Sequence, residues 1–325
     1  MSKSSKSKSN KPKIRNISVE DLSPAELDLT ISPYKLEFEV INGSAALANA
    51  LRRCAMNEIP IKVATCHIDN YNTNDEFPFR ENIIKRLNNI CLNQKIVTEN
   101  TQLKLNIKNT GTNLIDVHTW DFTATDGKKN LNIKKLCNDV VLCTLNPGKY
   151  LNMYCDIIEG VGEMGKDSGI FQLCYTGISL AQDIQPIDVG NNENMDNSSL
   201  NTDPHHHKVI LECNGEIKSD NLLDEIIQCL IGRFEYLMEK DNPDTIETIS
   251  DDVLELLVLN ESHTFGNLVK YYMLKEFELP FVNYEVKANY LECKLIIRNN
   301  SIEESKKIYY KTLQNIINDL EQLLK

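Results

Sequence analysis

Residues 160–165 (GVGEMG) have the G-x-G-x-x-G spacing with which dinucleotide-binding folds bring the backbone close to a pyrophosphate. That chemistry needs a strand before the glycines, a helix that begins at them, and an acidic residue about 20 positions later. Residues 153–158 can form the strand, but a strand-like run at 170–175 leaves little room for the helix. A nucleotide-binding enzyme that uses the 160–165 glycine loop is therefore an alternative and not the main prediction.

Three consecutive histidines, His205, His206 and His207, and ten cysteines are candidate metal ligands. Side chains alternate between the two faces of an extended chain, so adjacent histidines rarely chelate one ion. No two cysteines have C-x-x-C spacing, and most lie in apolar runs, which indicates reduced and mostly buried thiols. The sequence also contains no D-x-D-x-D cluster and no nucleophile signature with a plausible partner. We therefore expect no catalytic residue, no metal and no cofactor.

The chain of 325 residues has a formal net charge of −12, and an acidic surface repels phosphate. Protein partners are therefore expected rather than nucleic acid. No apolar run reaches the roughly 18 residues that a spanning helix needs, so no membrane contact is expected. Residues 1–15 are basic and have little to bury, which predicts a disordered tail that extends over residues 1–29. A DNA-binding regulator that uses this tail is a second alternative.

The element that stands out between these segments is a strand, a turn and a helix. Residues 35–41 (KLEFEVI) alternate between apolar and charged side chains, which predicts a strand with one buried face. Asn42 and Gly43 indicate a turn, and Ser44 is a favourable helix N-cap. Helical spacing of apolar residues follows and ends before Pro60.

The same element occurs twice. Residues 36–53 (LEFEVINGSAALANALRR) align without a gap with residues 254–271 (LELLVLNESHTFGNLVKY). The positions identical in both copies are Leu36/Leu254, Glu37/Glu255, Val40/Val258, Asn42/Asn260, Ser44/Ser262 and Asn49/Asn267. Each copy precedes a long amphipathic helix, predicted within residues 221–240 and 303–325.

Two similar units with apolar helix faces are expected to pack on each other about a pseudo-two-fold axis. We therefore predict an α+β fold with mixed, largely antiparallel sheets, in which the first unit carries a β-rich insertion. The predicted boundaries are 1–29 for the tail, 30–68 and 205–245 for the first dimerisation unit, 69–204 for the inserted domain, and 250–325 for the second dimerisation unit.

The residues of the two copies resemble a known family. The run LANALRR (47–53), followed by Glu58 and Pro60, is similar to the dimerisation helix of α-like subunits of multisubunit RNA polymerases. The run ESHTFGNLVKYYML (261–274) resembles the signature of the smaller α-like partner. The two halves thus look like the third-largest and eleventh subunits of RNA polymerase II, fused as in large nucleocytoplasmic DNA viruses.

Weaker similarities lie at residues 75–91, 146–148 and 160–169, within the insertion. There the His-Ala of the family pattern is replaced by Asp167 and Ser168, and the cysteine cluster that binds zinc in some homologues is absent. Neither function is therefore carried over.

The resemblance implies a non-catalytic assembly subunit of a DNA-directed RNA polymerase, which is not an enzyme on its own. The implied partners are the two large catalytic subunits and small subunits, with nucleic acid contacted only indirectly or through the tail. The implied location is the host cytoplasm (the viral factory) and the virion for a viral protein, and the nucleus for a cellular one.

Two groups of site residues follow from the repeat and the resemblance. Two consecutive arginines after an apolar helical stripe cannot both face the core, so they are either solvated charges or contacts to another chain. The resemblance implies a contact with a large subunit, which is the interpretation that we favour. The residues predicted for this contact are Arg52, Arg53 and Glu58. The residues predicted for the intramolecular dimerisation contact are Leu47, Asn49, Ala50, Leu51, Cys54, Phe265, Asn267, Leu268, Val269 and Tyr272.

Overall fold

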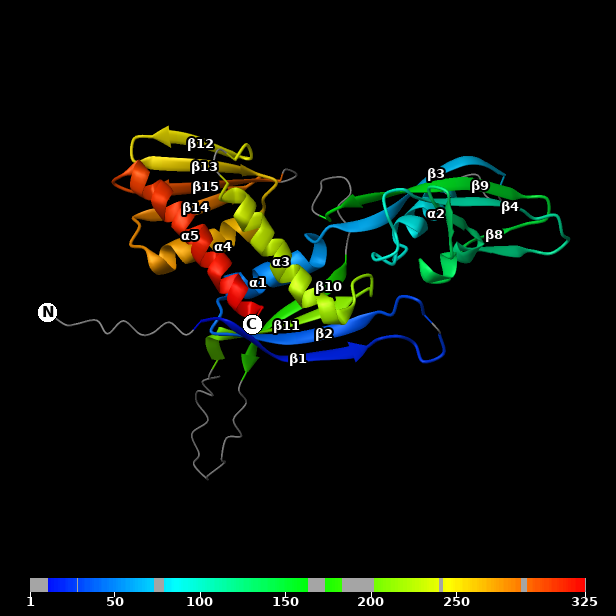
Figure 1. Cartoon of the computed structure of the whole chain (residues 1–325), viewed down its shortest axis with the longest axis horizontal. Coiled ribbons are helices and arrows are strands. Elements are labelled where there is room, and N and C mark those ends of the chain that lie inside the picture. The colour runs from blue at the N-terminus through cyan, green and yellow to red at the C-terminus, as the bar shows by residue number, and fades with distance from the viewer. Residues whose placement is uncertain are drawn as a thin grey trace, which may run out of the picture.

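The computed structural model describes residues 11–27, 29–72, 79–162, 173–182, 202–239, 242–287 and 291–324. In this part of the chain, five α-helices and four antiparallel sheets form a mixed fold, which confirms the predicted α+β class. Figure 1 shows a main body, in which helices lie between two four-stranded sheets, and an inserted β-rich domain beside it.

The first sheet of the main body is built from strands that are far apart in the sequence. Its order is β1-β2-β11-β10, with the bounds β1 Lys13–Asp21, β2 Tyr34–Ile41, β11 Thr202–Cys213 and β10 Cys174–Gln182. Helix α1 (Ala45–Asn57) follows β2, and helix α3 (Ser219–Leu237) follows β11. Along β2, Leu36, Phe38 and Val40 are buried, as their alternation predicts.

The second sheet has the order β12-β13-β15-β14. Its bounds are β12 Thr245–Ser250, β13 Val253–Leu259, β15 Glu292–Arg298 and β14 Phe281–Val286. Helix α4 (His263–Glu276) follows β13, and helix α5 (Ile302–Leu323) follows β15. The two sheets therefore share one scheme. Apart from the inserted domain, each copy runs along the chain as two strands, a helix, two strands and a helix, and corresponding strands occupy the same positions in the two sheets.

The turns of the two copies have matching backbone conformations. Asn42 and Asn260 both have a φ of 59°, in the left-handed region that asparagine tolerates better than most residues. Ser44 caps α1 by accepting a hydrogen bond from the backbone N–H of Leu47 at 3.0 Å. The aligned asparagines thus specify the same reversal of the chain before each helix.

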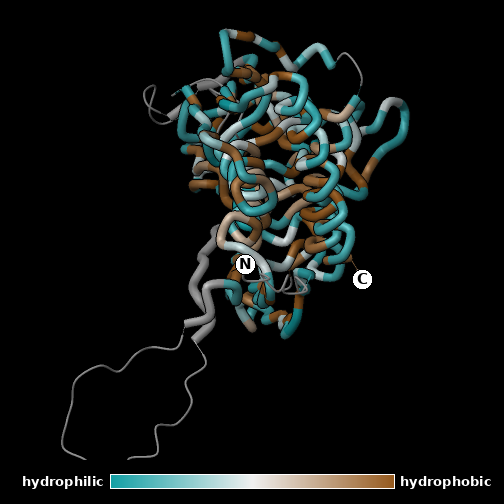
Figure 2. The backbone as a smooth tube through the Cα atoms, turned by 90° about the vertical axis from the view of Figure 1, so that its left-hand side faces the viewer, coloured by the Kyte–Doolittle hydropathy of each residue, from teal (hydrophilic) through white to brown (hydrophobic). Residues whose placement is uncertain are grey.

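One hydrophobic core joins both sheets and all four helices of the main body. It includes Phe38 of β2, Leu256 of β13, Leu230 of α3 and Leu313 of α5, each almost completely buried. Figure 2 shows hydrophobic and hydrophilic residues alternating along the tube of this body. The amphipathic patterns of the two units therefore converge on a single interior.

The prediction of a disordered tail over residues 1–29 is wrong for Lys13–Asp21. These residues form β1, which pairs antiparallel with β2, and Ile14 packs against the main core. The segment looks polar because it is an edge strand that exposes most of its side chains, while its backbone hydrogen bonds are supplied by β2. Residues 1–10 lie outside the described part.

The inserted domain runs from β3 to β9. It comprises a five-stranded sheet in the order β3-β9-β4-β6-β7, a two-stranded sheet β5-β8 and helix α2. The bounds are β3 Ile61–Asn72, α2 Phe79–Asn88, β4 Thr101–Lys108, β5 Ile115–His118, β6 Thr123–Asp126, β7 Lys129–Leu131, β8 Val141–Leu145 and β9 Tyr150–Gly160. The predicted limits of 69–204 start too late and end too late, because β3 begins at Ile61 and pairs with β9, whereas β10 pairs with β11 and so belongs to the first sheet.

Two cysteines correct the expectation of reduced thiols. Cys66 of β3 lies directly opposite Cys155 of β9, and the two form a disulfide. The residues are 89 positions apart in the sequence, so their spacing carries no local signature. The cysteines described as free are Cys54, Cys91, Cys137, Cys143, Cys213, Cys229 and Cys293, and most of them are buried as expected.

Polar contacts hold the inserted domain, which has its own hydrophobic core, against the first sheet. The side chain of Asn138 accepts from the backbone N–H of Ile31 at 2.9 Å and donates to its carbonyl at 2.7 Å. Glu216, which follows β11, accepts from the backbone N–H of Leu92 at 2.9 Å and from the amide of Asn214 at 2.8 Å. Burial raises the pKa of Glu216 to about 7 despite these hydrogen bonds.

This junction should make stability depend on pH. A carboxyl group whose pKa is higher in the folded than in the unfolded chain stabilises the fold at low pH, and that contribution is lost as the pH rises through about 7. Between pH 5 and pH 8, ionisation of Glu216 should lower the unfolding free energy of the wild type by about 2–3 kcal/mol. Glu216→Gln cannot ionise, so this variant should lack that decrease. Urea denaturation of both proteins across this range measures the difference.

The matched control is Glu212→Gln, on the exposed side of β11. This variant should follow the wild type at every pH. Identical pH profiles for the wild type and Glu216→Gln would contradict the assignment.

Candidate functional site

The four helices of the main body pack against one another between the sheets. Helix α1 contacts α4, α3 contacts α5, and further contacts join α1 to α3 and α4 to α5. The apolar residues predicted for the intramolecular contact are all buried in the shared core: Leu47, Ala50, Leu51, Cys54, Phe265, Leu268, Val269 and Tyr272. Asn49 and Asn267 are half-buried.

Aromatic residues connect these helices. The rings of Phe234 in α3 and Phe265 in α4 are stacked with centroids 6.1 Å apart. The hydroxyl of Tyr272 in α4 donates to the Asp319 carboxylate in α5 at 2.8 Å. Burial and the charge of Asp319 raise the pKa of Tyr272 well above its ordinary value, so this hydroxyl remains a donor.

A buried ionic cluster lies at the end of α1. Arg233 of α3 binds Glu58, the C-cap of α1, and makes a two-point ion pair with Glu261, which precedes α4. The exposed fractions of these side chains are 25% for Arg233, 4% for Glu58 and 6% for Glu261, so water screens the charges poorly. Burial opposes the charge of Arg233, but Glu261 and Glu58 raise its pKa well above the usual value. The cluster therefore joins α3 to the end of α1 and to the segment that precedes α4 through charges in a largely buried setting.

Arg53 extends the cluster from α1 to the start of α4. Its Nε donates to the hydroxyl of Thr264 at 2.9 Å, and its Nη2 donates to Ser262 at 3.4 Å. Thr264 in turn donates to Glu58. Glu58 and Arg53 therefore make contacts within the chain, and their predicted contact with a large subunit stays a prediction.

Arg52, the third residue predicted to contact a large subunit, lies outside this cluster. Its Nε donates to the side chain of Asn49 at 3.0 Å, and the residue is half-buried. Arg52 and Arg53 are both half-buried, and the contact of Arg52 with a large subunit stays a prediction as well.

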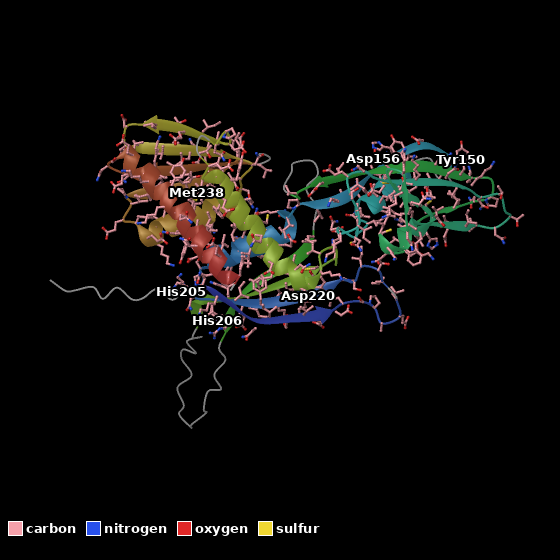
Figure 3. The ribbon with its side chains drawn as sticks, in the orientation of Figure 1. Tyr150, Asp156, His205, His206, Asp220 and Met238 are labelled. Atoms are coloured by element: carbon pink, nitrogen blue, oxygen red, sulfur yellow. A yellow bond between two sulfur atoms is a disulfide. The ribbon has the colours of Figure 1, made fainter. Side chains whose placement is uncertain are left out.

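Beside the cluster lies a cavity of about 310 Å³, which we call the α3 cavity. Its walls are mainly apolar and come from Pro60, Val161, Leu237, Leu259 and Leu291. Its polar groups come from Glu58, Cys229, Arg233, Tyr236, Asp244, Asn260 and Glu261. Figure 3 shows that α3 runs from Asp220, near the first sheet, to Met238, near the second, so its last turns reach the second unit.

Sequence reasoning missed Arg233, Tyr236 and Asp244. A signal existed for Arg233, because it lies between Leu230 and Phe234 in a helix whose apolar stripe must face the core. Its two carboxylate partners are 175 and 28 residues away, so the sequence did not indicate them.

The described part of the glycine loop, residues 160–162, does not begin a helix. Gly160 ends β9, and the backbone N–H of Gly162 donates to the carbonyl of Asn57 at 2.6 Å. A Cβ atom at Gly162 would lie 2.4 Å from the Cβ of Asn57, so the glycine permits a close approach to the end of α1. Gly165 lies outside the described residues, and so do residues 170–172 of the strand-like run expected at 170–175.

The three histidines do not converge. His205 is exposed, His206 pairs with Glu39 at 2.8 Å, and His207 points into the protein with 2% of its surface exposed. Within the described ranges, no group of three His, Cys, Asp or Glu side chains is arranged to hold a metal ion. In the same described ranges, no helix is both long and apolar enough to cross a membrane.

The sequence matches no protein-family model and no curated protein.

Proposed function

We propose that this protein is a non-catalytic assembly subunit of a DNA-dependent RNA polymerase, with two α-like units fused in one chain. The observation that carries the proposal is the contact between α1 and α4, the two helices whose sequences resemble the α-like family. Helices that dimerise between separate chains in that family would here dimerise within one chain.

The arrangement of contacts supports a pseudo-two-fold relation between the units. An axis through the α1–α4 contact would also relate α3 to α5, and it would exchange the α1–α3 contact with the α4–α5 contact. The shared order of strands in the two sheets is consistent with the same axis. On this proposal, residues near 30–68 and 205–245 form the third-subunit-like unit, and 250–325 form the eleventh-subunit-like unit.

The platform would bring together the two large catalytic subunits and the small subunits of the polymerase. The large subunits would supply the catalytic metal and its ligands, and this chain would supply a rigid surface. The fusion resembles those of large nucleocytoplasmic DNA viruses, so we propose the viral factory and the virion as its location.

Affinity purification of the tagged chain from its native source tests the proposal. We expect two much larger chains to co-purify, and we expect template-directed RNA synthesis from that complex but not from the purified chain in magnesium. Arg52→Ala should weaken recovery of the large chains by about tenfold in affinity, because a charged hydrogen bond is lost. The unfolding free energy should change by less than about 1 kcal/mol.

Lys287→Ala is the control, because that side chain is 72% exposed, follows β14 and is far from α1 in the sequence. Recovery of the chain without large partners, or RNA synthesis by the chain alone, would refute the proposed function.

A further inference from the structure

The α3 cavity has the size and walls of a site for one side chain. Its volume of about 310 Å³ is at the lower end of the range for small-molecule pockets. Three leucines form much of its wall: Leu237 of α3, Leu259 of β13 and Leu291, which immediately precedes β15. Such walls suit the aliphatic part of a long polar side chain, which lies against apolar surface while its charged end finds a polar partner.

The charges around this cavity are not balanced. Among the described residues that line it are three carboxylates, Glu58, Glu261 and Asp244, and one guanidinium, Arg233. Arg233 is already bound to Glu58 and Glu261. Asp244 accepts hydrogen bonds from the hydroxyl of Tyr236 at 2.9 Å and from Asn260 at 3.4 Å. It has no ion pair with any described residue.

Asp244 and Tyr236, which we call the receptor groups, present a carboxylate and an aromatic ring, the two kinds of group that a planar cation binds. A guanidinium can bind a carboxylate through two parallel N–H groups and can lie on an aromatic ring. Both receptor groups lie on the side of the cavity formed by the end of α3 and the start of the second unit. A lysine ammonium would lack the planar match.

We propose that the α3 cavity binds an arginine side chain of a partner chain, with the guanidinium on Asp244 and Tyr236 and the aliphatic carbons against the three leucines. That the partner is a large polymerase subunit rests on the proposed function above. The recognition of arginine does not, because it follows from the charges and walls of the cavity.

The test is an NMR titration of the full chain carrying ¹³C-methyl labels on leucine and valine, so that Leu237, Leu259, Leu291 and Val161 report from the cavity walls. The probes are N-acetyl-arginine N-methylamide and its citrulline counterpart, which has nearly the same shape and no charge. We expect saturable shifts of these methyl signals with the arginine probe, and about tenfold weaker binding of the citrulline probe.

Asp244→Asn should reduce the affinity for the arginine probe to that of the citrulline probe, with the other methyl signals unchanged. Glu247→Gln, which alters an exposed ion pair on β12, is the matched control and should bind like the wild type. Absence of saturable shifts at tens of millimolar probe, or equal affinity for both probes, would overturn the proposal.

The two proposals fail separately. Binding of arginine by a chain that co-purifies with no polymerase would refute the proposed function and leave the arginine site intact. Recovery of the polymerase with a chain that does not bind the arginine probe would refute the arginine site and leave the proposed function intact.

Discussion

Replacing Leu268 with aspartate should lower the free energy of unfolding of the main body by about 4 kcal/mol or more. Leu268 lies in α4 with 0% of its surface exposed, in the core that also contains Leu51 of α1. The change removes a well-packed side chain and places a carboxylate where no water can solvate it. If the proposed function holds, recruitment of partner chains should be lost together with stability, because the α1–α4 contact would form the platform.

Two spectroscopic signals can separate this effect from general damage. The single tryptophan, Trp120, lies in the inserted domain, whereas helical circular dichroism comes mainly from the main body. In a urea titration, Leu268→Asp should shift the circular dichroism transition strongly and the tryptophan transition much less, since the two domains have separate cores.

Leu274→Asp is the matched control, because Leu274 lies in the same helix and is 49% exposed. It should cost less than about 1 kcal/mol. A similar loss in both variants, or a stable Leu268→Asp protein, would show that the α1–α4 contact does not hold the units together.

Replacing Arg233 with methionine should cost about 3–5 kcal/mol, the second-largest effect that we expect. The substitution keeps an aliphatic side chain but leaves Glu58 and Glu261 buried without their common cation. The penalty comes from the two stranded carboxylates more than from the lost ion pairs. The triple variant Arg233→Met, Glu58→Gln, Glu261→Gln should therefore recover part of the lost stability, as urea denaturation would show.

Lys294→Met is the control for this experiment. Lys294 pairs with Glu255 at 2.7 Å on the second sheet, where the side chains are 37% and 29% exposed, so its removal should cost at most about 1 kcal/mol. If Arg233→Met were as mild as Lys294→Met, or if the triple variant were less stable than Arg233→Met, the cluster would not connect the units as proposed.

The local elements of this protein can be predicted from its sequence because each depends on neighbouring residues. The alternation of apolar residues in β2, the N-cap Ser44 and the apolar stripe of α5 are all patterns of residues that are close in sequence. The repeat also predicts that the turns at Asn42 and Asn260 match, and both residues have a φ of 59°. The residues of the α1–α4 contact could be named for the same reason, since a buried face must be apolar at helical spacing.

Pairings across the chain could not be predicted in this way. Strand β1 looks like part of a polar tail until β2 supplies its hydrogen bonds, and β10 looks like part of the insertion until β11 pairs with it. Cys66 and Cys155 form a disulfide only because β3 and β9 place them opposite each other. In each case the residue types are compatible with several partners, and the backbone register selects one.

The sequence by itself determined two apolar strand-turn-helix units and the faces on which they must meet. Only the tertiary structure decided that Arg233 lies between Glu58 and Glu261, that Glu216 becomes a buried carboxyl with a raised pKa, and that Asp244 faces a cavity. The physical reason is that apolar burial follows a short repeating pattern, whereas the energy of a charge depends on its surroundings in three dimensions. Those surroundings come from segments that are distant in sequence.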